Sequence, residues 1–361
     1  MSQEIANPDV VGEELTIDSD VHLQICHEDL VPYLDEPWRS RMKDSHTGQQ
    51  PNDGWDRTVN GKFLMDFDSV QTADDLNQSL CNELGVDYPI INTLGLMSRN
   101  PEKDWSVALM KSHNDFLIDK FLDTYDNFLG LATITTQQPD KAAEEIDRMG
   151  SEEDIVGVYI HNTGPNPPLG DSFYDTMWEA AEDNNLNIAF HGSADGFMFE
   201  FPRQNQSLNQ FIEVHTLAHP WSQMLTMISL IVEGTVEKFP DLKWAFLEAG
   251  LSWVPYMLFR LNKEYSMRRS EAPLLEKMPE EYFREKMYVA SQPLEEPMAE
   301  TDLAKLIDVV GTDNILFTTD YPHWDFDNPE TLNQHLQRMF DPEDLTKVMT
   351  QNAIEMFDLN L

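Results

Sequence analysis

Four side chains in this sequence have the types and the spacing of a metal site. Asp20 and His22 lie two residues apart in TIDSDVH, so in a β-strand both point to the same side. His191 ends the apolar run NIAFH, and Asp320 ends the run ILFTTD. A single histidine or aspartate at a strand end is more often a packing or capping residue. Four ligand types at three such ends instead favour a site for a divalent cation.

These residues meet only if the ends of distant strands converge. Short apolar runs alternate with longer amphipathic stretches along the chain, which is the pattern of βα units and a parallel sheet. The runs predict eight strands: Leu15–Asp20, Tyr88–Asn92, Phe128–Ile134, Ile155–Ile160, Asn187–His191, Lys243–Glu248, Met287–Ser291 and Ile315–Asp320. Eight units favour an α/β protein with a (β/α)8 TIM barrel, whose active site lies at the carboxyl ends of the strands.

The organisation of the chain favours a single domain over residues 1–361. No fixed repeat and no glycine- or proline-rich linker divides it. The fingerprints GxGxxG and GxxxxGK[ST] do not occur where a nucleotide site needs them, which disfavours an open doubly wound sheet. The stretch from about residue 26 to 86 is too long for an ordinary βα loop and predicts an insertion after the first strand.

The charge of the chain narrows the classes of partner. There are 65 Asp and Glu against 24 Lys and Arg, a formal net charge of -41. Such a field repels nucleic acid and anionic membranes and leaves a small-molecule substrate as the expected partner. Acidity spread over the whole chain suggests adaptation to concentrated salt, so we expect a halophilic source. Two cysteines, no signal peptide and no apolar run of ~18 residues predict a soluble, cytoplasmic protein.

Several longer segments resemble a known family of enzymes. The segments are Asp20-Val-His22, His191-Gly192, HPWSQMLTMISLIVEGTVEKFPDLKWAFLEAGLSWVPYMLFRL and FTTDYPHWD. They are similar to the amidohydrolase superfamily, specifically the amidohydrolase-related branch that includes aminocarboxymuconate semialdehyde decarboxylase and the resorcylate decarboxylases. The resemblance covers nearly the whole chain from about Leu15 onward. It implies a distorted TIM barrel, a mononuclear site, and substrates that are aromatic or unsaturated carboxylic acids.

The resemblance also bears on the metal. The first-strand motif of the family is commonly His-x-His, whereas Asp20 takes the first position here. A carboxylate oxygen is a harder ligand than an imidazole nitrogen, so the set Asp20, His22, His191 and Asp320 is harder than the usual one. Zinc is the first expectation and manganese its competitor. The fourth strand ends YIHNTG, without a lysine that could be carbamylated between two metals, so one metal per chain is expected. Relatives are commonly dimers, which makes a homodimer the expected assembly.

A second departure concerns the proton donor. Relatives carry a histidine after the sixth strand, but this chain has Leu247-Glu248-Ala249-Gly250, which puts Glu248 in the donor's position. A carboxyl group in a partly apolar mouth near other carboxylates can have its pKa raised toward neutrality and act as acid or base. The alternative is that Glu248 pairs with an arginine or orients a ligand histidine. His219 is the second candidate, at the predicted start of the helix after strand five, with Pro220 in its first turn.

Two mechanisms suit one metal with these neighbours. A carboxy-lyase, favoured by the resemblance, needs a proton donor over the reacting carbon, which Glu248 or His219 supplies. A hydrolase of an amide, ester or lactone needs a general base beside the metal-bound water, which Asp320 supplies. In either, an arginine of the long first loop, Arg57, Arg39 or Arg41, is expected to bind a substrate carboxylate. His323 is expected to bond Asp320 or the substrate. A barrel that binds metal without catalysis is the third interpretation.

Overall fold

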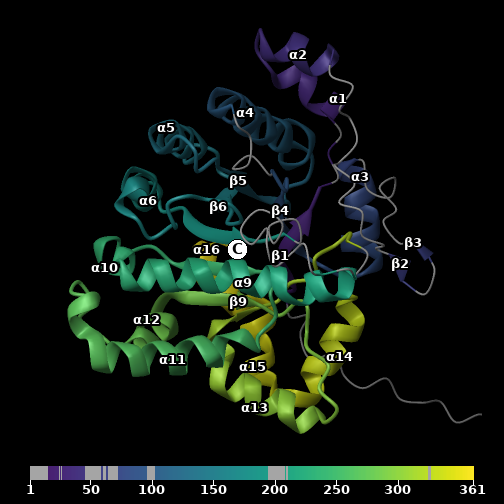
Figure 1. Cartoon of the computed structure of the whole chain (residues 1–361). Helices are drawn as coiled ribbons and strands as arrows, with labels where there is room; N and C mark the ends of the chain where they lie inside the picture. Colours follow the sequence, from purple (N-terminus) through teal and green to yellow (C-terminus); the bar gives the residue numbers. More distant parts are fainter. Residues whose placement is uncertain are drawn as a thin grey trace, which may run out of the picture.

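Eight parallel strands form the frame of the protein. The structure is a computed structural model that describes residues 15–23, 25, 27–44, 58–59, 62–63, 72–95, 102–193, 208, 210–323 and 327–361. Its main sheet has the order β1-β4-β5-β6-β7-β8-β9-β10, with helices packed outside it (Figure 1). The strands are β1 (Ile17–His22), β4 (Tyr88–Asn92), β5 (Leu129–Thr133), β6 (Ile155–His161), β7 (Asn187–His191), β8 (Trp244–Leu247), β9 (Met287–Ala290) and β10 (Ile315–Leu316). The predicted (β/α)8 TIM barrel is confirmed.

The first strand and the chain after the last strand close the ring. Val21 and Tyr321 form a parallel bridge. The backbone N–H of Ser19 donates to the carbonyl of Phe317 at 3.0 Å. These bonds explain why β10 ends at Leu316 and not four residues later as predicted: the backbone that follows bonds to β1 instead of continuing the ladder with β9.

Amphipathic helices cover the outside of the barrel. In α5 (Pro139–Met149), Ala142, Ile146 and Met149 are buried at spacings of four and three residues, so one stripe packs inward. The other long helices are α4 (Lys103–Lys120), α6 (Asp175–Asp183), α9 (Phe211–Val232), α11 (Trp253–Arg268), α12 (Pro279–Lys286), α13 (Glu300–Val310) and α14 (Pro329–Met339). Short ones are α10 (Thr235–Lys238), α15 (Pro342–Thr346), α16 (Asn352–Phe357), η4 (Leu122–Thr124), η5 (Ser172–Tyr174), η6 (Arg269–Glu271), η7 (Thr312–Asn314) and η8 (Lys347–Gln351). None of the described helices is long and apolar enough to cross a membrane.

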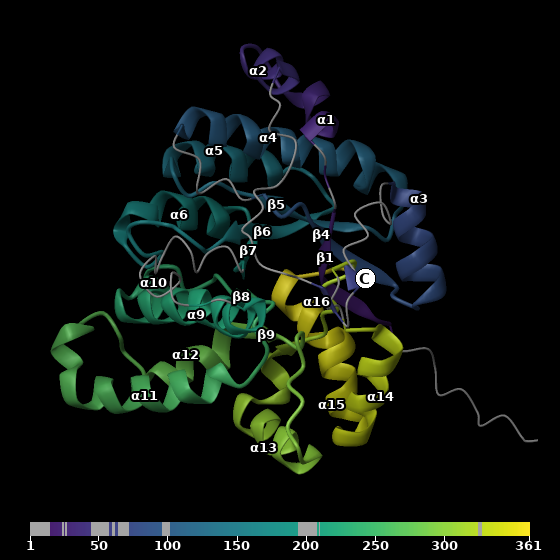
Figure 2. The ribbon, with the colours of Figure 1, turned by 45° about the vertical axis from the view of Figure 1, so that its right-hand side comes forward.

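The segment between β1 and β4 corresponds to the predicted insertion. Its described elements are α1 (His27–Leu30), η1 (Val31–Tyr33), α2 (Trp38–Asp44), the antiparallel pair β2 (Thr58–Val59) and β3 (Lys62–Phe63), α3 (Ala73–Leu76) and η2 (Asn77–Glu83). In Figures 1 and 2, α1 and α2 lie beyond α4 at the top of the molecule. The organisation of residues 1–361 as one domain stays a prediction.

The C-terminal helix closes one end of the barrel. Inside the ring, Ile17, Leu131 and Tyr159 belong to an apolar core that also contains Met356 and Phe357 of α16. At the start of β7, the side-chain amide of Asn187 donates to the carbonyl of Met356 at 2.7 Å. Because these contacts lie at the amino ends of the strands, α16 fills that end of the barrel.

Candidate metal centre

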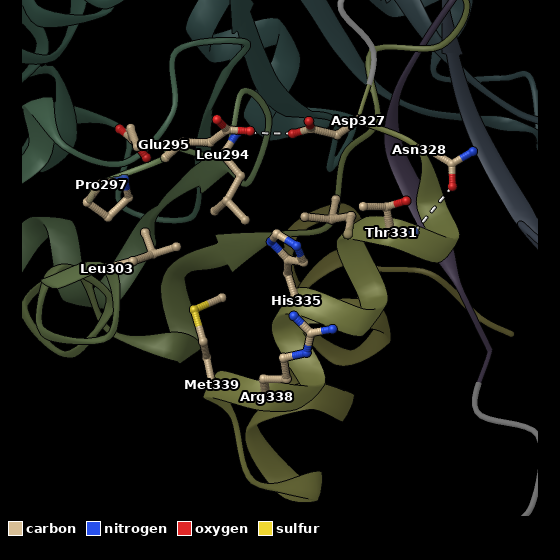
Figure 3. A pocket seen from close by; sticks show the side chains of 12 residues that line it. Leu294, Glu295, Pro297, Leu303, Asp327, Asn328, Thr331, His335, Arg338 and Met339 are labelled. Carbon is tan, nitrogen blue, oxygen red and sulfur yellow. Dashed lines mark hydrogen bonds between the residues drawn. The ribbon is translucent and has the colours of Figure 1, made fainter. Parts of the chain in front are cut away.

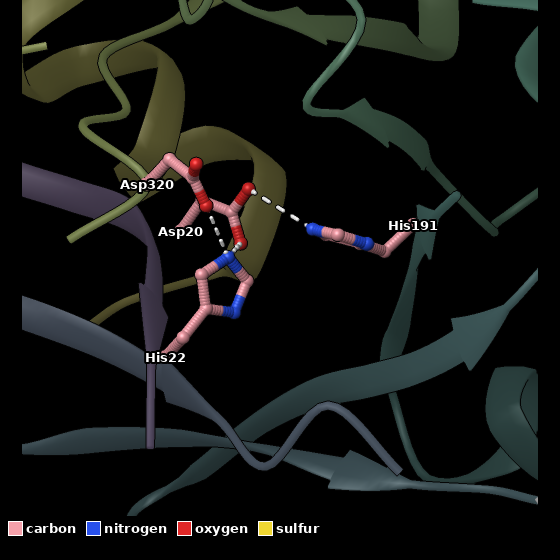
Figure 4. A group of neighbouring side chains, drawn as sticks. All are labelled: Asp20, His22, His191 and Asp320. Atoms are coloured by element: carbon pink, nitrogen blue, oxygen red, sulfur yellow. Dashed lines mark ion pairs between the residues drawn. The ribbon is translucent and has the colours of Figure 1, made fainter. Parts of the chain in front are cut away.

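Four predicted ligands meet at the carboxyl end of the barrel (Figure 4). Asp20 and His22 come from β1, His191 ends β7, and Asp320 follows β10. One ligand atom from each lies within 4.8 Å of the others, and all four residues are buried. His22 Nε2 lies 2.7 Å from Asp320 Oδ1, and His191 Nε2 lies 3.8 Å from Asp20 Oδ2. The barrel thus brings together residues up to 300 positions apart in the sequence, from Asp20 to Asp320.

Neighbouring groups fix which nitrogen of each imidazole faces the centre. The amide oxygen of Asn92 lies 2.9 Å from His22 Nδ1, and the carbonyl of Gly192 lies 2.6 Å from His191 Nδ1. Both oxygens are acceptors, so each Nδ1 carries a proton and each Nε2 faces the centre, where it can bind a metal once it carries no proton of its own. This is the arrangement in which protein histidines bind metals.

The donor atoms fit a divalent ion. Asp20 Oδ2, His22 Nε2 and His191 Nε2 are buried without a hydrogen-bond partner among the described residues. The contacts of His22 and His191 with carboxylates are ion pairs, in which each Nε2 lies 2.7 Å from an oxygen of Asp320 or Glu248. Buried polar atoms without partners are costly, and a cation bound between two carboxylates and two imidazoles would satisfy them.

In the metal-free centre, a protonated His191 supplies the positive charge that the carboxylates require. Burial raises the pKa of Asp20 to about 6. Burial acts to lower the pKa of His191, but Glu248 and Asp20 outweigh it and raise it to about 9. Without metal, His191 is therefore an imidazolium among carboxylates, and metal binding must displace its proton.

Glu248 lies directly after β8 and links His191 to His219. Its Oε2 is 2.7 Å from His191 Nε2, and its Oε1 is 3.5 Å from His219 Nε2. Burial alone would raise the pKa of Glu248, but His219 and His191 hold it well below its usual value. The predicted shift toward neutrality is therefore wrong for the metal-free centre. The contact with His191 matches the alternative in which Glu248 orients a ligand histidine.

His219 reaches the centre from within a helix and not from its start, so that prediction is wrong. α9 begins at Phe211, two turns earlier. The carboxylate of Glu213 accepts the backbone N–H of Gln210 at 2.9 Å, a capping bond that begins the helix there and leaves Pro220 inside it. Burial lowers the pKa of His219 to about 4, so its imidazole is neutral near pH 7.

Two of the candidate acid–base residues have strained backbones. Glu248 has φ 49° and Asp320 has φ 64°, in the left-handed region that residues other than glycine seldom adopt. Each costs on the order of 1–3 kcal/mol, which the surrounding bonds must offset. Strain of this kind is common where a side chain is held for function.

His323 lies beside the centre, as predicted. Its Nδ1 is 2.6 Å from Asp320 Oδ1, and its ring stacks on His22 with centroids 4.5 Å apart. Its side chain is 19% exposed, against 2% or less for the four predicted ligands. His323 is therefore the most accessible of these groups. Arg57 lies outside the described residues.

Asp18 is a buried carboxylate that the sequence reasoning missed. Its Oδ1 accepts the backbone N–H groups of Asp20 at 3.2 Å and of Thr319 at 3.0 Å, and its Oδ2 accepts the Thr319 hydroxyl at 2.5 Å. Burial raises the pKa of Asp18 to about 7. Asp18 thereby holds the backbone at Asp20 and at Thr319, the residue before Asp320. The signal was present, since Asp18 shares the two-residue period of Asp20 and His22.

A hollow on the surface lies apart from these groups (Figure 3). It is found between the chain after β9 and helix α14, with Leu294, Asp327 and His335 among its lining residues. The backbone N–H of Leu294 donates to Asp327 there at 3.0 Å. None of the predicted site residues that the structure describes lines this hollow, so it lies apart from the metal centre at the barrel mouth.

Comparison with known proteins identifies the family of the chain. The family model described as Amidohydrolase matches residues 98–359. The chain belongs to the amidohydrolase family. This assignment makes the protein a metal-dependent enzyme, and it confirms the resemblance seen in the sequence at the level of the family.

Relatives of this amidohydrolase include decarboxylases. A gamma-resorcylate decarboxylase from Rhodococcus jostii is 25% identical over 288 residues, 72% of this chain and 79% of the relative. An amidohydrolase from Mycobacterium avium subsp. paratuberculosis has a similar structure, with TM-score 0.77 and 20% identity over 97% and 99% of the chains. The 5-carboxyvanillate decarboxylase of Novosphingobium aromaticivorans, solved with manganese and 4-hydroxy-3-methoxy-5-nitrobenzoic acid, has TM-score 0.73 and 19% identity over 99% and 100%.

Proposed function

We propose that this amidohydrolase is a carboxy-lyase that removes the carboxyl group of an aromatic or unsaturated carboxylic acid. The observation that carries the proposal is the convergence of the four ligands with Glu248 and His219 beside them. Two of the relatives named above are decarboxylases of aromatic acids. One divalent ion held by Asp20, His22, His191 and Asp320, zinc or its competitor manganese, would bind the substrate carboxylate or an adjacent hydroxyl and neutralise its charge.

Glu248 is the proposed proton donor. When His191 gives Nε2 to the metal, it no longer presents a positive charge to Glu248. Asp20 and Asp320 would balance the charge of the ion, and the substrate carboxylate would add a negative charge, so burial and repulsion would act to raise the pKa of Glu248 from its low value in the metal-free centre. Its proton passes to the carbon that bears the carboxylate, the carbon–carbon bond breaks, and CO2 leaves. Glu248 then takes a proton from water, or from His219, the second candidate.

Two further residues are proposed to contact the substrate. His323 lies at the accessible side of Asp320, where its ring can meet a bound ligand. Arg57 in the insertion is proposed to bind a second acidic group of the substrate through two of its N–H donors.

Hydrolysis of an amide, ester or lactone is the second candidate, and the charge state of Asp320 favours it. Burial and Glu248 act to raise the pKa of Asp320, but His323 and His22 outweigh them and lower it. An ionised carboxylate beside a metal is what a general base for water requires.

The setting of the enzyme follows from its charge. With a net charge of -41, we infer that it works in the cytoplasm of a salt-adapted cell. Repulsion among its acidic groups is weak only where salt is concentrated.

One experiment on purified protein separates these functions. The enzyme, prepared in concentrated KCl and loaded with zinc or manganese, is given hydroxylated and carboxylated benzoates for CO2 release, and ester, amide and lactone panels for hydrolysis. We expect about one metal per chain by plasma mass spectrometry, and its loss in Asp320→Ala and His191→Ala. Glu248→Gln should keep the metal and lose CO2 release by about 10²–10⁴-fold.

The outcomes distinguish the candidates. Hydrolysis without CO2 release, retained in Glu248→Gln, would favour Asp320 as a general base. A wild-type protein that is folded and binds neither zinc nor manganese would contradict the metal centre itself.

A further inference from the structure

A second group of ligand-type side chains lies next to the metal centre. His215, His219 and Glu248 each offer one ligand atom, and these atoms all lie within 4.8 Å of one another. Both histidines come from α9, whereas Glu248 follows β8. None of the four ligands proposed for the first ion belongs to this group. Two imidazoles and one carboxylate are a ligand set that holds zinc in catalytic sites and leaves one position open.

The helix presents both histidines on one face. His215 and His219 are four residues apart, so their side chains lie one turn above the other. Their rings pack edge to face with centroids 5.3 Å apart. The ring of Phe211, one turn earlier, stacks on His215 with centroids 5.1 Å apart. These contacts restrict the rotation of the His215 ring.

The two oxygens of Glu248 face different histidines. Oε2 lies 2.7 Å from Nε2 of His191, a ligand proposed for the first ion, and Oε1 lies 3.5 Å from Nε2 of His219. Ligand atoms bound at ~2.0–2.2 Å to a tetrahedral ion lie roughly 3.3–3.6 Å apart. The separation between Glu248 and His219 falls in this range, so an ion could bind both with little movement of either side chain.

Burial leaves His219 short of bonding partners. The residue is 6% exposed, and its Nδ1 has no hydrogen-bond partner among the described residues. Buried polar atoms without partners are costly and commonly mark a place where a water molecule or an ion binds. His215 is only partly buried, which lets an ion from solvent reach the group.

We propose that His215, His219 and Glu248 form a second, inhibitory zinc site. Zinc in excess would bind the three side chains and keep Oε1 of Glu248 from carrying a proton, so the carboxy-lyase would lose its proton donor. The binding of zinc is independent of the reaction, but the inhibition rests on the proposed function of Glu248. Because imidazole ligands favour zinc over manganese, manganese should inhibit far less.

Charge makes the second site weaker than the first. Two divalent ions would bring more positive charge than Asp20, Asp320 and Glu248 balance, so the ions would repel each other across Glu248. The first ion, with four protein ligands, would therefore bind at low free zinc, and the second would bind only in excess.

Equilibrium dialysis at free zinc concentrations fixed by a chelator tests the site. Wild type that already holds one zinc should take up about one more per chain as free zinc rises. His215→Ala should raise the dissociation constant of the second zinc by about 100-fold or more, because losing a ligand costs more than losing an outer partner. His335→Ala is the matched control, since His335 is exposed and lines the hollow beside α14.

The rate of CO2 release over the same zinc series tests the inhibition. At low free zinc, His215→Ala should react at the wild-type rate, because His215 is outside the proposed reaction. In excess zinc, the wild-type rate should fall by at least about 100-fold as the general acid is lost. His215→Ala should keep its rate at the same zinc concentration.

Chemical labelling of the wild type needs no variant. Diethyl pyrocarbonate should modify His215 more slowly in excess zinc, because a metal-bound nitrogen cannot attack the reagent, and should modify His335 at an unchanged rate. A wild type that binds one zinc per chain up to ~1 mM free zinc would overturn the site. A second zinc that His215→Ala retains with equal affinity would also overturn it.

The two measurements separate the site from the reaction. A second zinc that binds without slowing CO2 release would overturn the inhibition and would contradict Glu248 as the proton donor. If the enzyme is a hydrolase instead, dialysis and labelling still decide the zinc site, because neither uses activity.

Discussion

Asn92 forms hydrogen bonds with two ligands of the metal centre, Asp20 and His22. Its side-chain amide donates to Asp20 Oδ1 at 2.9 Å, while its oxygen accepts from His22 Nδ1 at the same distance. One side chain thereby orients the carboxylate and selects the tautomer of the imidazole. Neighbours that orient ligands in this way contribute about 10–100-fold to metal affinity.

Asn92→Asp should therefore weaken metal binding by about 10–100-fold without unfolding the protein. The variant keeps the shape of the side chain but replaces the donor to Asp20 with a repelling oxygen. The measurement is the metal dissociation constant by competition with a chelator. Asn127→Asp is the control, because the side-chain amide of Asn127 donates a hydrogen bond to the carbonyl of Asp87, away from the centre. Equal affinities for wild type and Asn92→Asp would show that Asn92 does not position the ligands.

The protonation of His191 predicts how pH acts on the metal-free enzyme. Its pKa is about 9 in the folded state against an ordinary 6.5, so the stability it contributes is present below about pH 6.5 and is lost as pH rises through 9. We expect a loss on the order of 2 kcal/mol between pH 7.5 and 9.5 with a chelator present. Urea unfolding at each pH measures it. Metal should reverse the trend, because binding releases the proton.

His191→Gln provides the control for this pH dependence. Its metal-free form should lose the decline in stability over the same interval. A decline of unchanged size in His191→Gln would assign the titration to another group.

Much of the site was predictable because its residues end strands. The side chains of Asp20, His22, His191 and Asp320 lie where strand-end reasoning places them. Asn92 also ends a strand and could have been found by the same rule. The charge state of Glu248 could not be predicted from the sequence, because it depends on two imidazoles that the fold brings from β7 and α9.

Among the elements, the seam between β1 and the chain after β10 depends on one carboxylate. Asp18 accepts two backbone N–H groups through Oδ1 and the Thr319 hydroxyl through Oδ2. Its pKa of about 7 means that it is partly neutral at neutral pH. Hydrogen bonding, more than charge, is therefore its contribution to closing the barrel.

Asp18→Ala should lower the free energy of unfolding by about 2–4 kcal/mol, because it leaves buried donors without acceptors. Asp18→Asn should cost less than ~1 kcal/mol, since its oxygen still accepts both N–H groups and its amide can donate to Thr319. Urea denaturation in concentrated KCl measures both. Similar losses in the two variants would mean that the negative charge matters and the hydrogen bonds do not.

The strands were easier to predict than the helix that carries His219. All eight strands follow from apolar runs, and the boundary errors of more than one residue arise where the ring closes, at β1 and β10. Ring closure depends on contacts between the two ends of the sheet, which a local pattern does not contain. In α9, Pro220 suggested a helix start, but the capping bond at Glu213 determines where the helix begins.

At the scale of the whole molecule, the net charge of -41 predicts a stability that depends on salt. The Debye length falls from ~10 Å at 0.1 M to ~3 Å at 1 M salt, so repulsion between acidic groups weakens steeply over that range. We expect the midpoint of thermal unfolding to rise as KCl increases from 0.1 to about 2 M. Sucrose at matched osmolality is the control. Full stability in dilute buffer would contradict adaptation to salt.

The position of α16 determines how molecules enter and leave the barrel. Since α16 fills the amino end of the barrel, we expect substrates to reach the metal centre from the carboxyl end, on the side of His323. Substrate entry and product release would then share one route. A product that is still bound would therefore block the next substrate. The larger product would leave this route more slowly than CO2. The rate of its release would then determine how soon the next substrate binds.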